Sequence, residues 1–275
     1  MPYLKNRSNN GLYFKDWGTG RPVVLIHGWP LCSDAFDVQS MHLAEQGFRV
    51  IAYDRRGFGR SDQPFDGYDY DTMADDLCDV IDTLDLRDAV IAGFSMGGGE
   101  VVRYLSRHGG ERIAGAVLIS SVVPLLELRD DHPDGVDPSL FDSMKEGIEK
   151  DRPGFFAEFF KAFYGVGLLK HPVSDATLDW SRQMAMRASL KATMDCVDAF
   201  GRTDFRRDLE NIDCPMMVIH GTADATVPIE LTADKVAQAL PRATIKRYEG
   251  SPHGLPATDA KRLSDDLIEF ARGLN

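Results

Sequence analysis

Short apolar runs recur along the chain, and amphipathic stretches separate them. The runs are four to eight residues long and occupy residues 23–26, 48–53, 89–94, 113–120 and 215–221. A continuous apolar run of this length is typical of a strand that is buried on both faces of a parallel sheet. The segment 244–248, TIKRY, which is less apolar, is predicted to be the last strand.

The stretches between these runs have the spacing of helices. In residues 71–84, apolar side chains recur three and four positions apart, at Met73, Leu77, Val80, Ile81 and Leu84. Helices are also predicted over 101–109, 230–240 and 259–272. Strands that alternate with helices predict an α/β fold, in which a mostly parallel central sheet carries helices on both faces.

Residues 122–195 interrupt this alternation and contain no convincing strand. The segment opens with a stretch rich in Pro and Asp, and it continues with FFAEFFKAFYG, in which Phe156, Phe159, Phe160 and Phe163 fall on one helical face. We expect a helical cap at 122–195, inserted after the sixth strand. The core domain is then formed by residues 1–121 and 196–275.

Composition removes several classes of function. The 275 residues include 31 basic and 43 acidic side chains, a net charge of −12, so a nucleic-acid partner is not expected. The four cysteines lie far apart in no CxxC spacing, which predicts neither a zinc site nor a disulfide framework. The N-terminus has no apolar signal region, and no apolar run approaches the roughly 20 residues of a membrane span. We therefore expect a cytoplasmic protein without a membrane partner.

A candidate nucleophile lies in GFSMG, residues 93–97, where a strand pattern gives way to a helix pattern. This context fits the strand–turn–helix elbow that presents the serine of G-x-S-x-G, here Ser95. Glycine is needed two residues to either side of the serine because larger side chains would collide in the sharp turn. The alternative is a glycine-rich turn that contains an incidental serine.

The serine needs a base, and the base needs an acid to orient it. In this kind of fold the chain order is Ser, then Asp or Glu, then His, and His253 alone follows the last predicted strand. Asp224 directly follows the preceding strand and is the candidate acid. The alternatives are a polar loop histidine and an Asx turn or helix cap. For His220, at the end of that strand, we expect a structural role.

Acyl transfer also needs N–H donors directed at the developing oxyanion. The backbone N–H of Met96 is one candidate because it follows the serine. The loop HGWP, residues 27–30, follows the early strand and supplies the other at Trp29, since Pro30 has no N–H. Trp29 could instead be a core residue only.

Together, HGWPLCSDAF, YDRRGFGRSD, GFSMGGGE, CVDAFGRTDF, HGTADATVP and YEGSPHG resemble the α/β-hydrolase fold. More narrowly, they resemble bacterial cofactor-free haloperoxidases (perhydrolases), aryl esterases and γ-lactamases. The resemblance implies a triad of Ser95, Asp224 and His253, with Trp29 and Met96 as the oxyanion hole. It also implies catalysis without a metal or other cofactor, and frequent homo-oligomers. YDRRGFGRS is assigned no chemistry.

The predicted function is hydrolysis of small carboxylic esters through an acyl-enzyme on Ser95, with hydrogen peroxide as a second nucleophile that yields a peracid. A γ-lactamase or lactonase with the same residues is an alternative, and a non-catalytic ligand receptor is another. A dehalogenase or epoxide hydrolase needs an aspartate nucleophile, and position 95 is serine. The predicted pocket consists of Trp29, Pro30 and Phe94, which lie close to the proposed oxyanion site in sequence, and of Phe159, Phe163 and Phe200, which resemble pocket residues of the family. Bulky aromatic side chains there predict small acyl groups and aromatic alcohols, and the alternative for the cap phenylalanines is ordinary packing of the cap.

Pro30 carries a separate hypothesis about the choice of nucleophile. Its ring restricts Trp29 and fixes the plane of the Trp29 carbonyl, which can then accept a hydrogen bond from an incoming hydrogen peroxide. One net hydrogen bond, worth about 1 kcal/mol, would change the ratio of perhydrolysis to hydrolysis several-fold. The alternative is that Pro30 only stiffens the loop.

Overall fold

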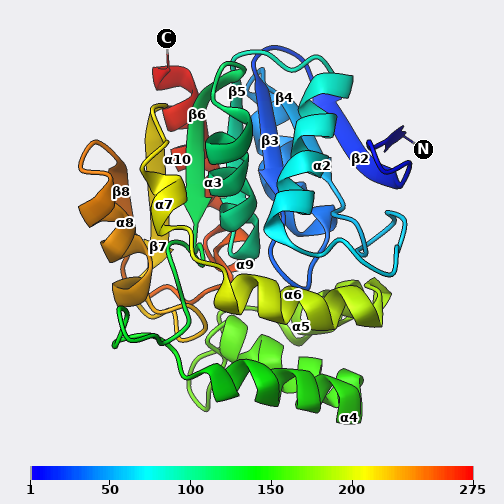
Figure 1. Ribbon diagram of the computed structural model, residues 1–275, viewed down its shortest axis with the longest axis vertical. Coiled ribbons are helices and arrows are strands. Elements are labelled where there is room, and N and C mark those ends of the chain that lie inside the picture. The colour runs from blue at the N-terminus through cyan, green and yellow to red at the C-terminus, as the bar shows by residue number, and fades with distance from the viewer. Residues whose placement is uncertain (1, 275) are drawn as a thin grey trace.

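The computed structural model describes residues 2–274 and contains a central eight-stranded sheet (Figure 1). The strands stand in the order β1-β2-β4-β3-β5-β6-β7-β8, and only β1 and β2 pair antiparallel to their neighbours. Their bounds are β1 Tyr3–Lys5, β2 Gly11–Gly18, β3 Pro22–Ile26, β4 Arg49–Tyr53, β5 Ala89–Phe94, β6 Ile113–Ile119, β7 Met216–Gly221 and β8 Thr244–Tyr248. The predicted α/β fold with a mostly parallel sheet is confirmed.

Helices cover both faces of the sheet. The helices α2 and α3 pack together on one face, and α1 and α10 pack together on the other (Figure 1). The helices are α1 Asp37–Glu45, α2 Tyr70–Thr83, α3 Met96–His108, α4 Pro138–Phe163, α5 Asp175–Arg187, α6 Leu190–Arg202, α7 Arg206–Leu209, α8 Ala233–Ala239, α9 Leu255–Thr258 and α10 Ala260–Gly273. Two 3-10 turns, η1 Ser33–Phe36 and η2 Ile229–Leu231, complete the list.

Of the helices between β6 and β7, α4, α5 and α6 lie across one end of the sheet and form the lower part of Figure 1, whereas α7 packs against α3. The long helix α4 bends at Asp151, whose φ of −156° and ψ of 82° are not helical, two residues before Pro153. Proline cannot continue the hydrogen-bond ladder of the helix before it, which accounts for the bend. Residue 195, the predicted end of the cap, lies inside α6, so this helix runs on from the predicted cap segment into the predicted core segment.

The predicted strands and helices match the observed ones within a few residues, but β1, β2, α1 and the short helices α7 and α9 were not predicted. In β2, the charged pair Lys15 and Asp16 interrupts the apolar pattern, and Lys15 is nevertheless buried because it pairs with Asp34 and Asp37. Helix α1, DVQSMHLAE, has no regular apolar face. Both segments are therefore fixed by tertiary contacts rather than by their own sequence pattern.

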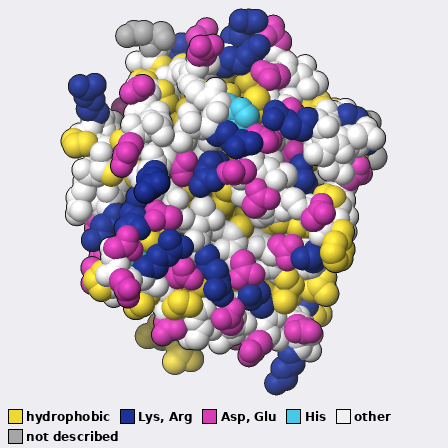
Figure 2. Space-filling view, viewed as in Figure 1, with side chains coloured by type: hydrophobic (Ala, Val, Ile, Leu, Met, Phe, Trp, Pro, Cys, Tyr) yellow, Lys and Arg dark blue, Asp and Glu magenta, His cyan; other side chains and the backbone are white. Residues whose placement is uncertain are grey.

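On the face shown in Figure 2, basic and acidic side chains are interspersed, and no large area carries one sign of charge. The net charge of −12 is thus distributed rather than concentrated on this face. No helix of residues 2–274 has both the length and the apolar character needed to cross a bilayer.

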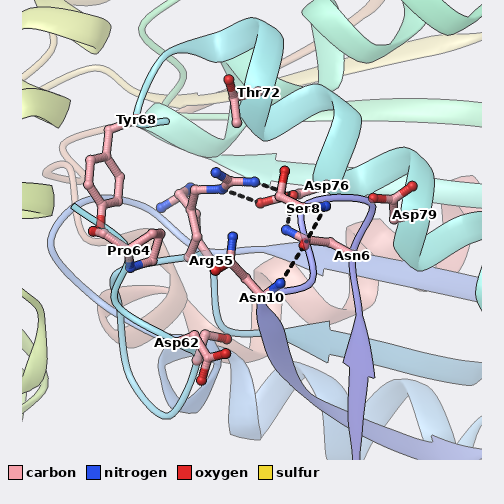
Figure 3. Close-up of polar contacts among 12 residues, drawn as sticks. Asn6, Ser8, Asn10, Arg55, Asp62, Pro64, Tyr68, Thr72, Asp76 and Asp79 are labelled. Carbon is pink, nitrogen blue, oxygen red and sulfur yellow. Dashed lines mark hydrogen bonds and ion pairs between the residues drawn. The ribbon is translucent and has the colours of Figure 1, made fainter. Parts of the chain in front are cut away.

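A buried polar cluster ties the N-terminal hairpin to α2 (Figure 3). Asn6 Nδ2 donates to Asp76 Oδ1 at 2.6 Å, while Asn6 Oδ1 accepts the backbone N–H groups of Ser8 and Asn10. Arg56 makes two further hydrogen bonds to Asp76, at 2.6 and 2.7 Å. Because both charged groups are almost fully buried, each depends on the other for compensation.

Candidate active site

Ser95 lies in a sharp turn between β5 and α3 and has φ of 53° and ψ of −118°. A non-glycine residue rarely adopts a positive φ, so this turn stores backbone strain. A Cβ atom at Gly93 would collide with the backbone of Gly97, and one at Gly97 would collide with the carbonyl of Ile26. Glycine is therefore required on both sides of Ser95, as the motif predicts.

The structure brings Ser95, His253 and Asp224 into one hydrogen-bonded chain. Ser95 Oγ lies 2.9 Å from Nε2 of His253, and Nδ1 of His253 lies 2.6 Å from Oδ2 of Asp224. Asp224 follows β7, and His253 lies in the loop between β8 and α9. Carboxyl ends of parallel strands meet at one edge of the sheet, which places groups 158 residues apart in contact.

The carboxylate of Asp224 is held at both oxygens. Its Oδ1 accepts the backbone N–H groups of Thr226 and Val227, at 2.9 and 2.8 Å, and its Oδ2 faces His253. Burial disfavours the charged form, but the interactions with His253 and His220 outweigh that cost and keep the pKa of Asp224 well below its ordinary value. Asp224 is therefore ionised at neutral pH and accepts the Nδ1–H of His253.

The predicted oxyanion donors are the backbone N–H groups of Met96, which follows Ser95, and of Trp29, which lines the same cavity as Ser95. Met96 is the first residue of α3, and the N–H groups in the first turn of a helix have no partner inside it. Within residues 2–274, neither the Met96 N–H nor the Trp29 N–H donates to a protein acceptor. The Trp29–Pro30 peptide bond in the neighbouring loop is cis.

The side chain of Trp29 connects this loop to the cap. Its Nε1 donates to the carbonyl of Thr193 in α6 at 3.0 Å. Its indole packs against the rings of Phe156, Phe159 and Phe200, with centroids 5.2 to 5.6 Å apart. Trp29 is 3% exposed, so its side chain belongs to the core, and it also lines the cavity that contains Ser95.

A cavity of about 340 Å³ opens over Ser95 and His253. Its lining is mostly apolar, and Glu158 is the one charged residue among the described residues that form it. The predicted pocket residues Trp29, Phe159, Phe163 and Phe200 all contribute. Sequence reasoning did not include the remaining apolar members, Val122, Leu126, Val136, Leu140, Phe141, Met144, Phe155, Ala162, Ala225 and Val227.

Two of the predicted pocket residues lie elsewhere. Phe94 borders a second cavity, also of about 340 Å³, which lies between α5 and the η1–α1 segment. The ring of Phe94 packs against the ring of His253, with centroids 5.2 Å apart, and so restricts the orientation of the imidazole. Pro30 is buried and lines neither cavity. Phe163 lines both cavities, and its ring lies 4.7 Å from that of His253.

A buried ion pair beneath the elbow was missed from the sequence. Arg55, from YDRRGFGRS, pairs with Glu100 of α3 and donates from Nη2 to the carbonyl of His27 at 2.6 Å. Tyr53 donates to Glu100 at 2.8 Å. Burial raises the pKa of Glu100 even though Arg55 stabilises its charge. Arg55 thus connects His27, in the loop that precedes Trp29, to Glu100 in the helix that follows Ser95. Neither YDRRGFGRS nor GFSMGGGE indicates this contact when it is considered alone.

The residues described give no metal site. No group of three or more His, Cys, Asp or Glu side chains within residues 2–274 is arranged to hold a metal ion.

Comparison with known proteins places these features in a family. The model of the α/β-hydrolase fold family matches residues 21–260. The chain is 44% identical to a non-heme chloroperoxidase of Kitasatospora aureofaciens, over 98% of this chain and 99% of that one. It is 39% identical to a bifunctional esterase/perhydrolase of Acinetobacter calcoaceticus, over 99% and 100% of the two chains. A crystal structure of bromoperoxidase from Bacillus anthracis, 43% identical, superposes with a TM-score of 0.95 over 98% of this chain and 99% of that one. The chain belongs to the α/β-hydrolase fold family.

Proposed function

We propose that this protein is a serine hydrolase of small carboxylic esters that also uses hydrogen peroxide as a nucleophile. The observation that carries the proposal is the continuous hydrogen-bonded chain from Ser95 through His253 to Asp224 at the floor of an apolar cavity. The relatives named as an esterase/perhydrolase and as non-heme haloperoxidases support both halves of the proposal.

The proposed reaction begins with attack of Ser95 Oγ on the ester carbonyl, while Nε2 of His253 takes the hydroxyl proton. The N–H groups of Trp29 and Met96 bind the developing oxyanion. His253 then gives its proton to the leaving alcohol, and an acyl-enzyme remains on Ser95. Asp224 keeps its charge throughout and stabilises the imidazolium.

The second half-reaction decides the product. Water, deprotonated by His253, releases the carboxylic acid and frees Ser95. Hydrogen peroxide in the same position releases a peracid, in which the peroxide O–O bond is retained. The peracid would oxidise halide in solution, so halogenation would be indirect and would require no redox centre in the protein.

The cavity indicates the class of substrate. Its apolar lining favours neutral esters, since an anionic substrate would lose its hydration without finding a cationic side chain there. The aromatic side chains Trp29, Phe159, Phe163 and Phe200 restrict the space near Ser95 and suit short acyl groups with aromatic alcohols. A homo-oligomer and a cytoplasmic location are part of the same proposal, and the four unpaired cysteines are consistent with a reducing compartment.

The experiment is a substrate panel of short aryl esters, lactones and γ-lactams, each assayed with and without hydrogen peroxide. We expect turnover of aryl acetates by the wild type, peracid formation when peroxide is added, and loss of both reactions in Ser95→Ala. Preferential turnover of lactams or lactones would favour the alternative hydrolase with the same triad. Binding of esters without turnover, together with no labelling by a serine-directed phosphonate, would contradict the proposal and favour a receptor.

A further inference from the structure

His220 lies near the carboxyl end of β7, four residues before Asp224, and is 1% exposed. Its Nε2 is 2.9 Å from the carbonyl oxygen of Val227 and 3.2 Å from Oδ2 of Asp224. Its Nδ1 is buried and has no hydrogen-bond partner within residues 2–274. A buried polar atom without a partner costs stability. The ring is therefore held in this orientation by the contacts of Nε2 and not by Nδ1.

The two neighbours of Nε2 determine where the ring proton lies. A backbone carbonyl and a carboxylate are both acceptors, and neither can donate to a nitrogen lone pair. The neutral ring therefore carries its hydrogen on Nε2, where it donates to the carbonyl of Val227, and this nitrogen also lies 3.2 Å from Oδ2 of Asp224. The lone pair is left at Nδ1, the position that has no partner.

The Nε2–H of His220 stabilises the loop from Asp224 to Val227. Val227 accepts the His220 N–H through its carbonyl and donates its own N–H to Oδ1 of Asp224 at 2.8 Å. His220 also contacts Oδ2, the same oxygen that faces His253. The ring of His220 on β7 thus contacts the carboxylate on both sides, directly at Oδ2 and through Val227 at Oδ1.

We propose that His220 is a positioning residue for catalysis, which fixes the carboxylate of Asp224 in the orientation that His253 requires. The inference rests on the proposed function and assigns to His220 more than the structural role expected from sequence. The contacts with His253 and His220 together keep the pKa of Asp224 below its ordinary value in spite of burial. Without that N–H, Oδ2 would keep one donor, and the loop at 224–227 could turn the carboxylate away from His253.

Two amide substitutions separate the positioning role from mere filling of space. The amide nitrogen of glutamine reaches about as far along the side chain as Nε2 of histidine, whereas that of asparagine reaches only as far as Nδ1. His220→Gln can therefore still donate to Asp224, and His220→Asn cannot. His42→Asn is the matched control, because His42 is half-buried on α1 and contacts Ser264 rather than the site.

The assay is steady-state hydrolysis of an aryl acetate, with rates expressed per phosphonate-titrated site and with folding checked by thermal unfolding. We expect kcat of His220→Asn to fall about ten-fold or more, with KM within about two-fold of the wild type, as for loss of a hydrogen bond to a charged group. His220→Gln should exceed His220→Asn at least five-fold in kcat, and His42→Asn should match the wild type. Equal kcat for His220→Asn and the wild type, or equal losses in the Gln and Asn variants, would overturn the proposal.

A measurement on the wild type keeps the test independent of folding in the variants and of ester turnover. The ring ¹⁵N signals of His220 should show that the proton is on Nε2. A through-hydrogen-bond coupling should connect Nε2 to the carbonyl of Val227 in the Asp224–Val227 loop. Protonation at Nδ1 would overturn the proposal even if the protein is an active esterase. Failure of the wild type to hydrolyse any ester would contradict the proposed function instead.

Discussion

Truncation of Phe163 should lengthen the acyl chains that the protein accepts. The cavity over Ser95 and His253, here called the catalytic cavity, and the second cavity beside Phe94 are each about 340 Å³. Phe163 lines both of them. Its ring contacts Phe94 and His253, with centroids 5.9 and 4.7 Å away. Replacing this ring by a methyl group removes a side chain that lines both cavities, and joining the cavities would at most double the space open to a substrate.

The size of the effect follows from burial of the added methylenes. Each buried CH₂ is worth about 0.8 kcal/mol, which is about four-fold in kcat/KM if the gain is kept in the transition state. Four methylenes, the difference between an acetate and a hexanoate, set an upper limit of about 3 kcal/mol. Against this, removal of a buried phenylalanine costs about 3–5 kcal/mol of folding free energy, so Phe163→Leu serves as a milder second variant.

The assay is the kcat/KM series of 4-nitrophenyl acetate, butyrate, hexanoate and octanoate. The wild type should prefer the short esters, and Phe163→Ala should shift the optimum to longer ones. Phe205→Ala is the control, because Phe205 is a buried phenylalanine that lines neither cavity. An unchanged chain-length profile in a folded Phe163→Ala protein would refute the reasoning, as would an equal shift in Phe205→Ala.

Three further predictions concern the triad, the loop and the ion pair. Asp224→Asn should lower kcat by about 10³- to 10⁴-fold with KM little changed, because the amide favours the wrong tautomer of the base; steady-state kinetics showing a near-normal kcat would mean that another group orients the histidine. Pro30→Leu should lower the ratio of perhydrolysis to hydrolysis of one acetate ester several-fold, as expected for about 1 kcal/mol, and an unchanged ratio would leave Pro30 as a stiffener of the loop. Glu100→Ala leaves the buried Arg55 without a counter-ion and should lower the free energy of unfolding by about 3–5 kcal/mol in denaturant titrations. Asp265→Ala, which breaks an exposed ion pair with Lys261, should lower it by less than about 1 kcal/mol. Equal losses in the two variants would show that the buried pair contributes no more to stability than an exposed one.

The parts of the site that could be predicted are those with a local cause. The elbow at Ser95 needs a strand, a sharp turn, a helix and two glycines, and all of these leave marks within a dozen residues. His253 and Asp224 were found because the carboxyl ends of consecutive parallel strands converge, so chain order restricts the choices. The aromatic face of α4 was visible because helical periodicity is a local property.

The parts that could not be predicted depend on contacts between distant segments. Nothing near Arg55 indicates that its partner is Glu100, 45 residues away. Phe94 adjoins Ser95 in the chain, but successive side chains of a strand point to opposite faces, and its ring packs behind His253 instead of lining the catalytic cavity. The division of aromatic residues between two cavities is likewise a tertiary feature.

The central claim is that Ser95 carries the acyl group, and trapping that intermediate tests it most directly. Rapid acid quench during turnover of 4-nitrophenyl acetate, followed by peptide mass spectrometry, should place an acetyl group on Ser95 within GFSMG. The same experiment on Asp224→Asn should give the adduct more slowly, and Ser95→Ala should give none. An active enzyme that shows no adduct at Ser95, or that keeps its ester turnover as Ser95→Ala, would contradict the account.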